Sequence, residues 1–240
     1  MNTKEKRTTT YYTPEELELM ESGPLSDIFQ NITEKINDTD YPCVGAKAAV
    51  NSKQFRVGIY GNMATESTTL QLGEDLKNYI KETIESDSEY MTMIAVFENE
   101  DPESEQSFEK KLWSQLQYLH NTDTHALPWD PEVSSNPKDD DFSFSYNGTA
   151  FFIVGLHPKA SRKARRFGYT ALAFNLHRQF EQLREKGVYE NMKKVIRERE
   201  ELYDGSVNPM LNDFGEGLEA PQYSGRQVDE SWKCPFHKNR

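Results

Sequence analysis

The sequence is poor in cysteine and has no long apolar run. Its 240 residues include two cysteines, Cys43 and Cys234, which are far apart in the chain. Two cysteines give no disulfide framework, and neither has metal-ligand spacing to the other. No apolar run approaches the length of a membrane span, and the first ten residues are polar, unlike a signal peptide. We therefore expect a cytoplasmic protein with no membrane partner.

The motifs of common nucleotide-binding and hydrolytic enzymes are also absent. The chain has no G-x-x-x-x-G-K-[ST] loop, no G-x-G-x-x-G after an expected strand and no G-x-S-x-G. These absences argue against the common nucleotide enzymes and hydrolases. None of the five histidines forms an H-x-x-x-H pair, so a zinc site of that kind is not indicated. The net charge of −12 argues against a nucleic-acid partner.

Aromatic residues are plentiful, at 12% of the chain. Disordered chains are poor in aromatics, so we predict an ordered globular protein. The sequence shows no internal repeat and no linker. We predict one α+β domain over residues 1–240, with residues 1–12 flexible.

Local patterns predict the elements of this domain. A capping box predicts that one helix begins at Pro14. Apolar periodicity predicts further helices over 24–36, 65–84, 105–121, 171–186 and 188–203. Apolar runs predict strands at 55–60, 90–97, 142–146 and 149–156. Asn147-Gly148 predicts a tight hairpin between the last two. The expected fold is a small, mostly antiparallel sheet with this β-hairpin, packed by several helices.

A loop-rich C-terminal tail begins at residue 206. It contains Tyr223, Trp232 and Phe236, so we expect it to be docked on the body. Loops placed by glycines often carry sites, and carboxylates would bind a guanidino substrate through paired hydrogen bonds. The candidate substrate-binding residues are Asn208, Asp213, Glu216, Glu219 and Tyr223. The alternative is that these acids are ordinary solvated loop residues.

A basic segment stands out within this acidic chain. Residues 157–199 carry twelve Lys or Arg against four Glu, a net charge of +8 that leaves −20 for the rest. At its start an apolar run ends in His157, and arginines follow. An imidazole could ligate the iron of haem there, and guanidinium groups could hold its propionates. The alternatives are an exposed basic turn after a buried strand and pairing with the protein's own acids.

Several motifs in one order resemble the YqcI/YcgG family. They are Tyr41-Pro42-Cys43-Val44-Gly45-Ala46, His157-Pro158-x-x-Ser161-Arg162-x-x-Arg165-Arg166-Phe167, Asn208-Pro209-Met210-Leu211, Gln222-Tyr223-Ser224-Gly225-Arg226 and Trp232-x-Cys234-Pro235-Phe236. The likeness runs from about residue 30 to the C-terminus. The resemblance implies a haem protein, because some members of this family are haem-dependent oxygenases. Those members N-hydroxylate the guanidino group of arginine or related amino acids in bacterial natural-product pathways.

With haem b as the expected cofactor, His157 is the first choice of iron ligand, with His120 and Cys234 as alternatives. The residues expected to hold the propionates and to wall the pocket are Arg162, Arg165, Arg166, Phe152 and Phe167. We interpret Cys43 and His177 as packing residues, and His125 and His237 as exposed.

The expected function is N-hydroxylation of a small guanidino or amine substrate such as arginine. Dioxygen or peroxide would be the oxidant, and an oxygenase would also need an electron donor. One alternative is a haem-binding sensor or carrier without turnover, and another is a cofactor-free interaction protein. The sequence leaves the oligomeric state open.

Overall fold

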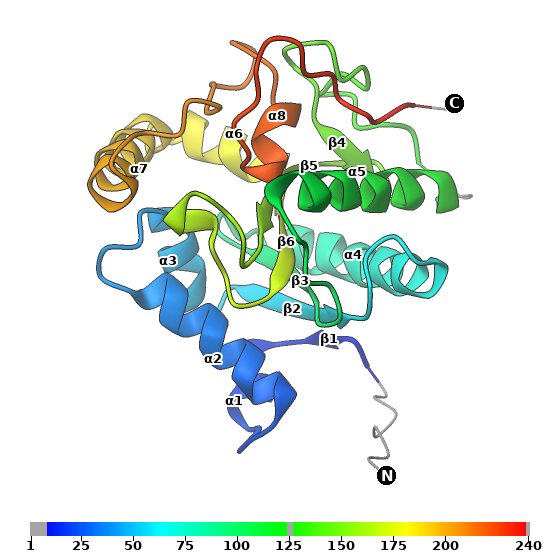
Figure 1. Cartoon of the computed structure of the whole chain (residues 1–240), viewed down its shortest axis with the longest axis vertical. Helices are drawn as coiled ribbons and strands as arrows, with labels where there is room; N and C mark the ends of the chain where they lie inside the picture. The colour runs from blue at the N-terminus through cyan, green and yellow to red at the C-terminus, as the bar shows by residue number, and fades with distance from the viewer. Residues whose placement is uncertain (1–8, 124–126, 239–240) are drawn as a thin grey trace.

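Within residues 9–123 and 127–238, which the computed structural model describes, six strands form one sheet in the order β1-β2-β3-β6-β5-β4. Helices pack on this sheet to give the predicted single α+β domain (Figure 1). The strands are β1 (Tyr11–Tyr12), β2 (Phe55–Tyr60), β3 (Thr92–Phe97), β4 (Phe144–Tyr146), β5 (Thr149–Leu156) and β6 (Thr170–Leu176).

The sheet is mixed, which corrects the expected small, mostly antiparallel sheet. β2 and β3 run parallel, with Phe55 opposite Thr92. The pairs β1–β2, β3–β6, β6–β5 and β5–β4 are antiparallel. Parallel pairing needs a crossover, and helix α4 (Glu66–Ser86) supplies it between β2 and β3.

The β4–β5 hairpin is confirmed. Its two turn residues both have positive φ, 49° at Asn147 and 72° at Gly148. These angles suit the mirror-image turns of tight hairpins, and they explain why Asn and Gly occupy the positions.

The prediction of a helix over residues 171–186 is wrong in its first half. Residues 170–176 form β6, and helix α6 (His177–Glu185) follows. Leu172, Phe174 and Leu176 are buried in alternation, which is the period of a strand. Pairing with β3 and β5 on both sides decides the conformation, and these partners are distant in the sequence.

The other predicted helices are confirmed, with small shifts at their ends. The remaining helices are α1 (Pro14–Glu18), α2 (Pro24–Asn37), α3 (Val44–Asn51), α5 (Glu105–Thr122), α7 (Tyr189–Asp204), α8 (Ala220–Ser224) and the 3-10 turn η1 (Lys163–Arg165). The capping box predicted at Thr13 is present. Helix α3 falls in a segment for which we predicted only tight packing. No helix in the described part of the chain is long and apolar enough to cross a membrane.

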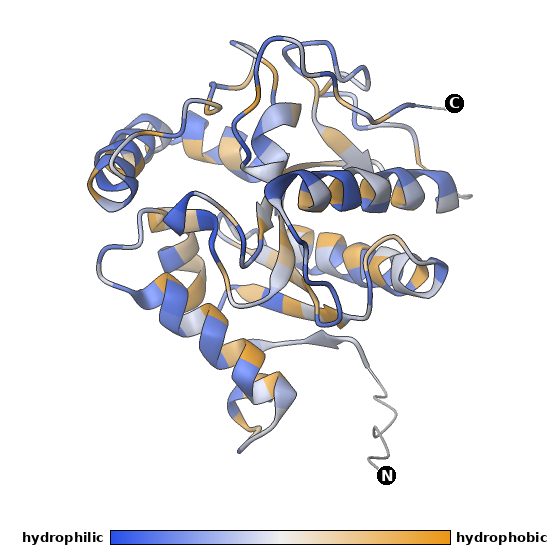
Figure 2. Ribbon diagram, viewed as in Figure 1, coloured by the Kyte–Doolittle hydropathy of each residue, from blue (hydrophilic) through white to orange (hydrophobic). Residues whose placement is uncertain are grey.

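Helices cover both faces of the sheet. One face packs against α4, α5 and α8, and the other packs against α1, α2 and α3 (Figure 1). Helix α7 contacts α3, and α6 contacts β5 and β6 on the same side. Apolar residues gather on the central strands and on the helix sides that face them (Figure 2).

Both ends of the described chain pack on the body. Tyr11 and Tyr12 pair with β2 as strand β1, so the segment expected to be flexible is ordered at its end; residues 1–8 lie outside the description. In the tail, Tyr223 and Phe236 are buried in the core that also holds α5. The predicted docking of the tail is confirmed.

Candidate functional site

A cavity of about 330 Å³ lies on the α3 side of the sheet. Its lining comes from β3, β5, β6, α3, α6, α7 and the segment 208–222. Sites for cofactors and small ligands usually measure roughly 300–1,000 Å³. This cavity is therefore our candidate functional site.

The sheet wall of the cavity follows from strand alternation. On β5, Phe152, Val154 and Leu156 line the cavity, while Phe151 and Ile153 point to the α5 side. Successive side chains of a strand point to opposite faces, so one strand serves both the core and the site. The same alternation on β3 and β6 contributes Thr92, Ile94, Ala173 and Asn175.

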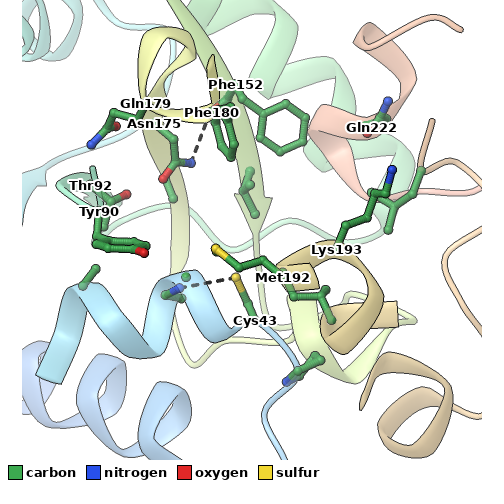
Figure 3. Close-up of a pocket in the computed structure, with 18 of the residues that line it drawn as sticks. Cys43, Tyr90, Thr92, Phe152, Asn175, Gln179, Phe180, Met192, Lys193 and Gln222 are labelled. Atoms are coloured by element: carbon green, nitrogen blue, oxygen red, sulfur yellow. Dashed lines mark hydrogen bonds between the residues drawn. The ribbon is translucent and has the colours of Figure 1, made fainter. Parts of the chain in front are cut away.

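Aromatic rings form much of the remaining wall. The ring of Phe152 meets that of Phe180 edge to face, with centroids 5.8 Å apart, and both rings are visible in Figure 3. The other aromatic residues in the lining are Tyr41, Tyr90, Phe167, Tyr189 and Phe214. Such walls favour a ligand with a large apolar or aromatic surface.

Cys43 lies in the lining at the start of α3. It is the N-cap residue of this helix, and its Sγ accepts a hydrogen bond from the backbone N–H of Ala46 at 3.4 Å. Burial raises the pKa of the Cys43 thiol, and the nearby N–H groups and the Arg165 guanidinium act in the opposite direction. We had interpreted Cys43 as packing. Its place before a helix start, next to Pro42, was the signal in the sequence.

Cationic side chains line the α6–α7 side of the cavity. Lys193 and Arg197 both contact Asp213, at 2.6 and 3.3 Å. The guanidinium of Arg184 lies over the ring of Tyr189, 4.3 Å from its centroid. Lys193 also pairs with Glu190, and Arg184 pairs with Glu181, so a carboxylate of a ligand would compete with the protein's own acids for these cations.

Glu219 supplies a buried carboxyl group to the lining. Ser143 Oγ donates to its Oε1 at 2.7 Å, and the Tyr223 hydroxyl donates to the same oxygen. Burial raises the pKa of Glu219 to about 7. This carboxyl group can therefore change its charge near neutral pH.

The other predicted substrate residues divide into two sets. Asn208 and Asp213 line the cavity with Glu219. Asn208 is buried, and its Oδ1 accepts the N–H of Met210 at 3.0 Å. Glu216 is exposed in a turn, and Tyr223 is buried behind Glu219 and holds it in place.

His157 is not among the residues that line the cavity. It is fully buried, and its ring stacks on Phe108 with centroids 4.2 Å apart. Neither ring nitrogen has a hydrogen-bond partner in the described structure. Burial lowers the pKa of His157 to about 4, so the imidazole is neutral. Gly155 makes room for this stack, since a Cβ there would lie 2.6 Å from Phe108.

The three arginines predicted to hold propionates are bound to the protein itself. Arg165 lines the cavity, but its guanidinium donates to the carbonyls of Gly155, Gln222 and Tyr223. Arg162 pairs with Glu200 at 3.0 Å and Arg166 donates to the carbonyls of Ala160 and Ser161. Arg162 shows the pairing with the protein's own acids that the sequence left open as an alternative, whereas Arg165 and Arg166 bind backbone carbonyls.

The remaining histidines and Cys234 lie mostly away from the cavity. His120 packs edge-on against Trp129 and Phe236, and Cys234 packs on the same core. His177 lines the cavity, where its Nε2 lies 3.3 Å from Glu181. His237 is exposed, as predicted, and His125 lies outside the described residues. Of the two predicted wall residues, Phe152 and Phe167, both line the cavity.

The comparison with protein families agrees with the resemblance in the motifs. The profile of the YqcI/YcgG family matches residues 32–237. This chain belongs to the YqcI/YcgG family. The match includes every element that lines the cavity.

Curated relatives cover nearly the whole chain. The uncharacterized proteins YqcI and YcgG of Bacillus subtilis (strain 168) are 29% and 24% identical, over 88% and 87% of this chain and 87% and 86% of their own lengths. A Streptomyces lavendulae protein, named as a candidate N(omega)-hydroxy-L-arginine synthase, DcsA, is 27% identical over 88% of this chain and 83% of its own. No solved structure gives a significant match.

The cavity offers groups that could hold haem, the cofactor implied by the resemblance. Its lining combines a thiol, aromatic walls, four Lys or Arg side chains and four acidic side chains around one space. The His157 loop offers an imidazole whose ring is covered by Phe108 and which does not face the cavity. Among the described residues, the cavity therefore suits haem better than the surroundings of His157 do.

Proposed function

We propose that this protein binds haem b in the cavity and N-hydroxylates a guanidino or amino group of arginine or a related small molecule. The observation that carries the proposal is the buried carboxyl group of Glu219 in the lining of an aromatic cavity. A guanidinium group donates two parallel hydrogen bonds to a carboxylate. The likeness to DcsA and the family membership support the same substrate class.

The two polar regions of the cavity suit the two ends of an amino acid. Glu219, beside Ser143 and Tyr223, would receive the cationic group. Lys193 and Arg197 would attract a carboxylate of the substrate or of the cofactor, in exchange for part of their contact with Asp213. The apolar wall between them would exclude water, which strengthens both attractions.

Bound haem would supply the activation of dioxygen or peroxide. With dioxygen, one oxygen atom enters the new N–O bond and the other leaves as water, so a donor must provide two electrons. The residues of this chain would orient the nitrogen and keep its positive charge paired with Glu219 until a proton leaves.

Absorption spectroscopy tests the proposal. We expect purified protein to take up hemin with a Soret band, and arginine to shift that band. With a reductant and oxygen, mass spectrometry should find arginine that has gained one oxygen atom. A spectral shift without product would favour the sensor or carrier, and no response to hemin would contradict haem binding.

A further inference from the structure

The cavity is lined by several side chains of kinds that ligate haem iron, among them tyrosines, methionines, Cys43 and His177. We propose that the Cys43 thiolate is the protein ligand of the iron. This inference rests on the proposed function, because it assumes that haem occupies the cavity. It differs from the assignment to His157, His120 or Cys234 that the sequence suggested.

The position of Cys43 is fixed by the local fold. Pro42 and Cys43 immediately precede α3, and Sγ lies where the backbone N–H of Ala46 points. Tyr41, two residues before Cys43, is held at both its side chain and its backbone. Its hydroxyl donates to the carbonyl of Ala164, and its own carbonyl accepts from Arg199. Figure 3 shows the sulfur directed toward the hollow, with the rings of Phe152 and Phe180 across it. The sulfur therefore faces the space that a flat ligand would fill.

The surroundings of Sγ suit a thiolate once a metal replaces its proton. The N-terminal end of a helix carries a partial positive charge, and backbone N–H groups stabilise a nearby anion. The half-buried Arg165 guanidinium adds a positive charge that favours the thiolate of Cys43, whereas burial and Glu200 favour the neutral thiol. Three carbonyls hold this guanidinium in place.

Small residues leave room beside the sulfur. Gly45, Ala46 and Ala49 of α3 all line the cavity. A Cβ added at Gly45 would come 3.5 Å from the terminal methyl of Met192. Longer side chains at these positions would reduce the space next to Cys43, which the terminal methyl of Met192 already borders.

The alternative donor is less available. The Nε2 of His177 contacts Glu181 at 3.3 Å, and the imidazole lies against the ring of Phe214 with centroids 4.3 Å apart. Ligation through Nε2 would separate His177 from Glu181. Ligation through Cys43 would break no ion pair, because its sulfur accepts a hydrogen bond from Ala46 and still faces the cavity.

The test is the spectrum of the reduced, hemin-loaded protein under carbon monoxide. A thiolate ligand shifts the Soret band strongly to the red relative to an imidazole ligand. We expect the red-shifted band in the native chain, in Cys234→Ser and in His177→Ala, and its loss in Cys43→Ser. Cys234→Ser is the matched control, because the chain has two cysteines and Cys234 does not line the cavity.

The outcomes separate this inference from the proposed function. If the native protein takes up hemin but gives the imidazole type of spectrum, Cys43 is not the ligand and haem binding stands. The same conclusion follows if Cys43→Ser keeps the red-shifted band. Failure of the native protein to take up hemin would overturn both proposals. If Cys43→Ser does not fold, the red-shifted band in Cys234→Ser alone assigns the ligand to Cys43.

Discussion

His157 and Cys43 both interact electrostatically with Arg165, but their surroundings differ. His157 lies in a filled region, where Phe108 covers its ring. Cys43 lies at the edge of a hollow, with small residues beside it. The histidine that looks most like an iron ligand in the sequence is packed, and the cysteine that looks like packing borders the cavity.

The difference follows from the strand that separates the two regions. Residues of β5 alternate between the filled core and the cavity, and the chain turns at His157 toward the filled side. Arg165 then returns to bind the carbonyl of Gly155 and ties the turn to the strand. The arginines of a basic run can therefore stabilise a loop through hydrogen bonds to backbone carbonyls, and such a run need not mark an anion site.

The largest expected effect is on the free energy of unfolding, when one side chain is truncated in the filled region around His157 and one beside the cavity. Phe108→Ala should lower the free energy of unfolding by about 3–5 kcal/mol, because it opens a void in a filled core. Met192→Ala should cost less than Phe108→Ala, since Met192 is half-buried and already borders a hollow. Urea denaturation of both variants measures this difference. Equal losses would mean that the two regions are packed alike.

The arginines provide a second comparison. Arg165→Leu removes the guanidinium donor from the carbonyls of Gly155, Gln222 and Tyr223, of which Gln222 keeps the N–H of Gly225. We expect a loss of about 3 kcal/mol. Arg166→Leu is the matched control, because Arg166 is exposed and should cost about 1 kcal/mol or less. Thermal unfolding of the two variants can rank them. A larger effect from Arg166→Leu would contradict the role that we assign to Arg165.

The buried imidazole predicts a pH dependence of stability. The pKa of His157 falls from 6.5 to about 4 on folding, so between these values the unfolded state binds the proton and the native state does not. Stability should therefore fall as pH drops from 6.5 to 4, by on the order of 3 kcal/mol from this residue. Glu105 and Arg165 are the charges that act on the imidazole, in opposite directions.

His157→Phe isolates this contribution. The variant keeps a flat ring against Phe108 and removes two buried nitrogens that lack partners. Its stability should equal or exceed that of the native chain at neutral pH, and the difference should grow on acidification. Denaturation at pH 7 and pH 5 measures it. An unchanged pH profile would show that His157 is not held neutral by burial.

The smallest expected effect concerns substrate binding at Glu219. Because the pKa of Glu219 is about 7, its carboxylate charge is present above that pH and lost below it. The affinity for arginine, measured by the spectral shift, should rise several-fold from pH 6 to pH 8. Glu219→Gln should bind more weakly and lose this rise. Glu216→Gln is the control, since Glu216 is exposed outside the cavity.

Local signals in the sequence were enough to predict much of the fold. The capping box at Thr13, the strand at 55–60 and the Asn147-Gly148 turn are all present. The helix predicted over 171–186 failed because Ala173, Leu176, Phe180 and Leu183 mimic one helical stripe across a strand and a helix. Pairing with β3 and β5 makes residues 170–176 a strand, and a local sequence pattern does not reveal such long-range pairing.

The candidate site was harder to predict than the fold. Phe152, Phe167, Asn208, Asp213 and Glu219 do line the cavity, because strand alternation and a docked tail place them there. The position of His157 depends on which way the chain turns after β5, and the sequence does not contain this direction. Cys43 was recognisable through its family motif, but only the fold places it beside the hollow.

The most direct test of the account is hemin uptake by variants that alter one region at a time. Ala173→Trp would fill the cavity from the middle of β6, and His157→Phe would change the filled region. Both variants are first checked by circular dichroism for a native fold. The account predicts that His157→Phe binds hemin as the native chain does and that Ala173→Trp binds little. Loss of hemin binding in His157→Phe, with binding intact in Ala173→Trp, would contradict it.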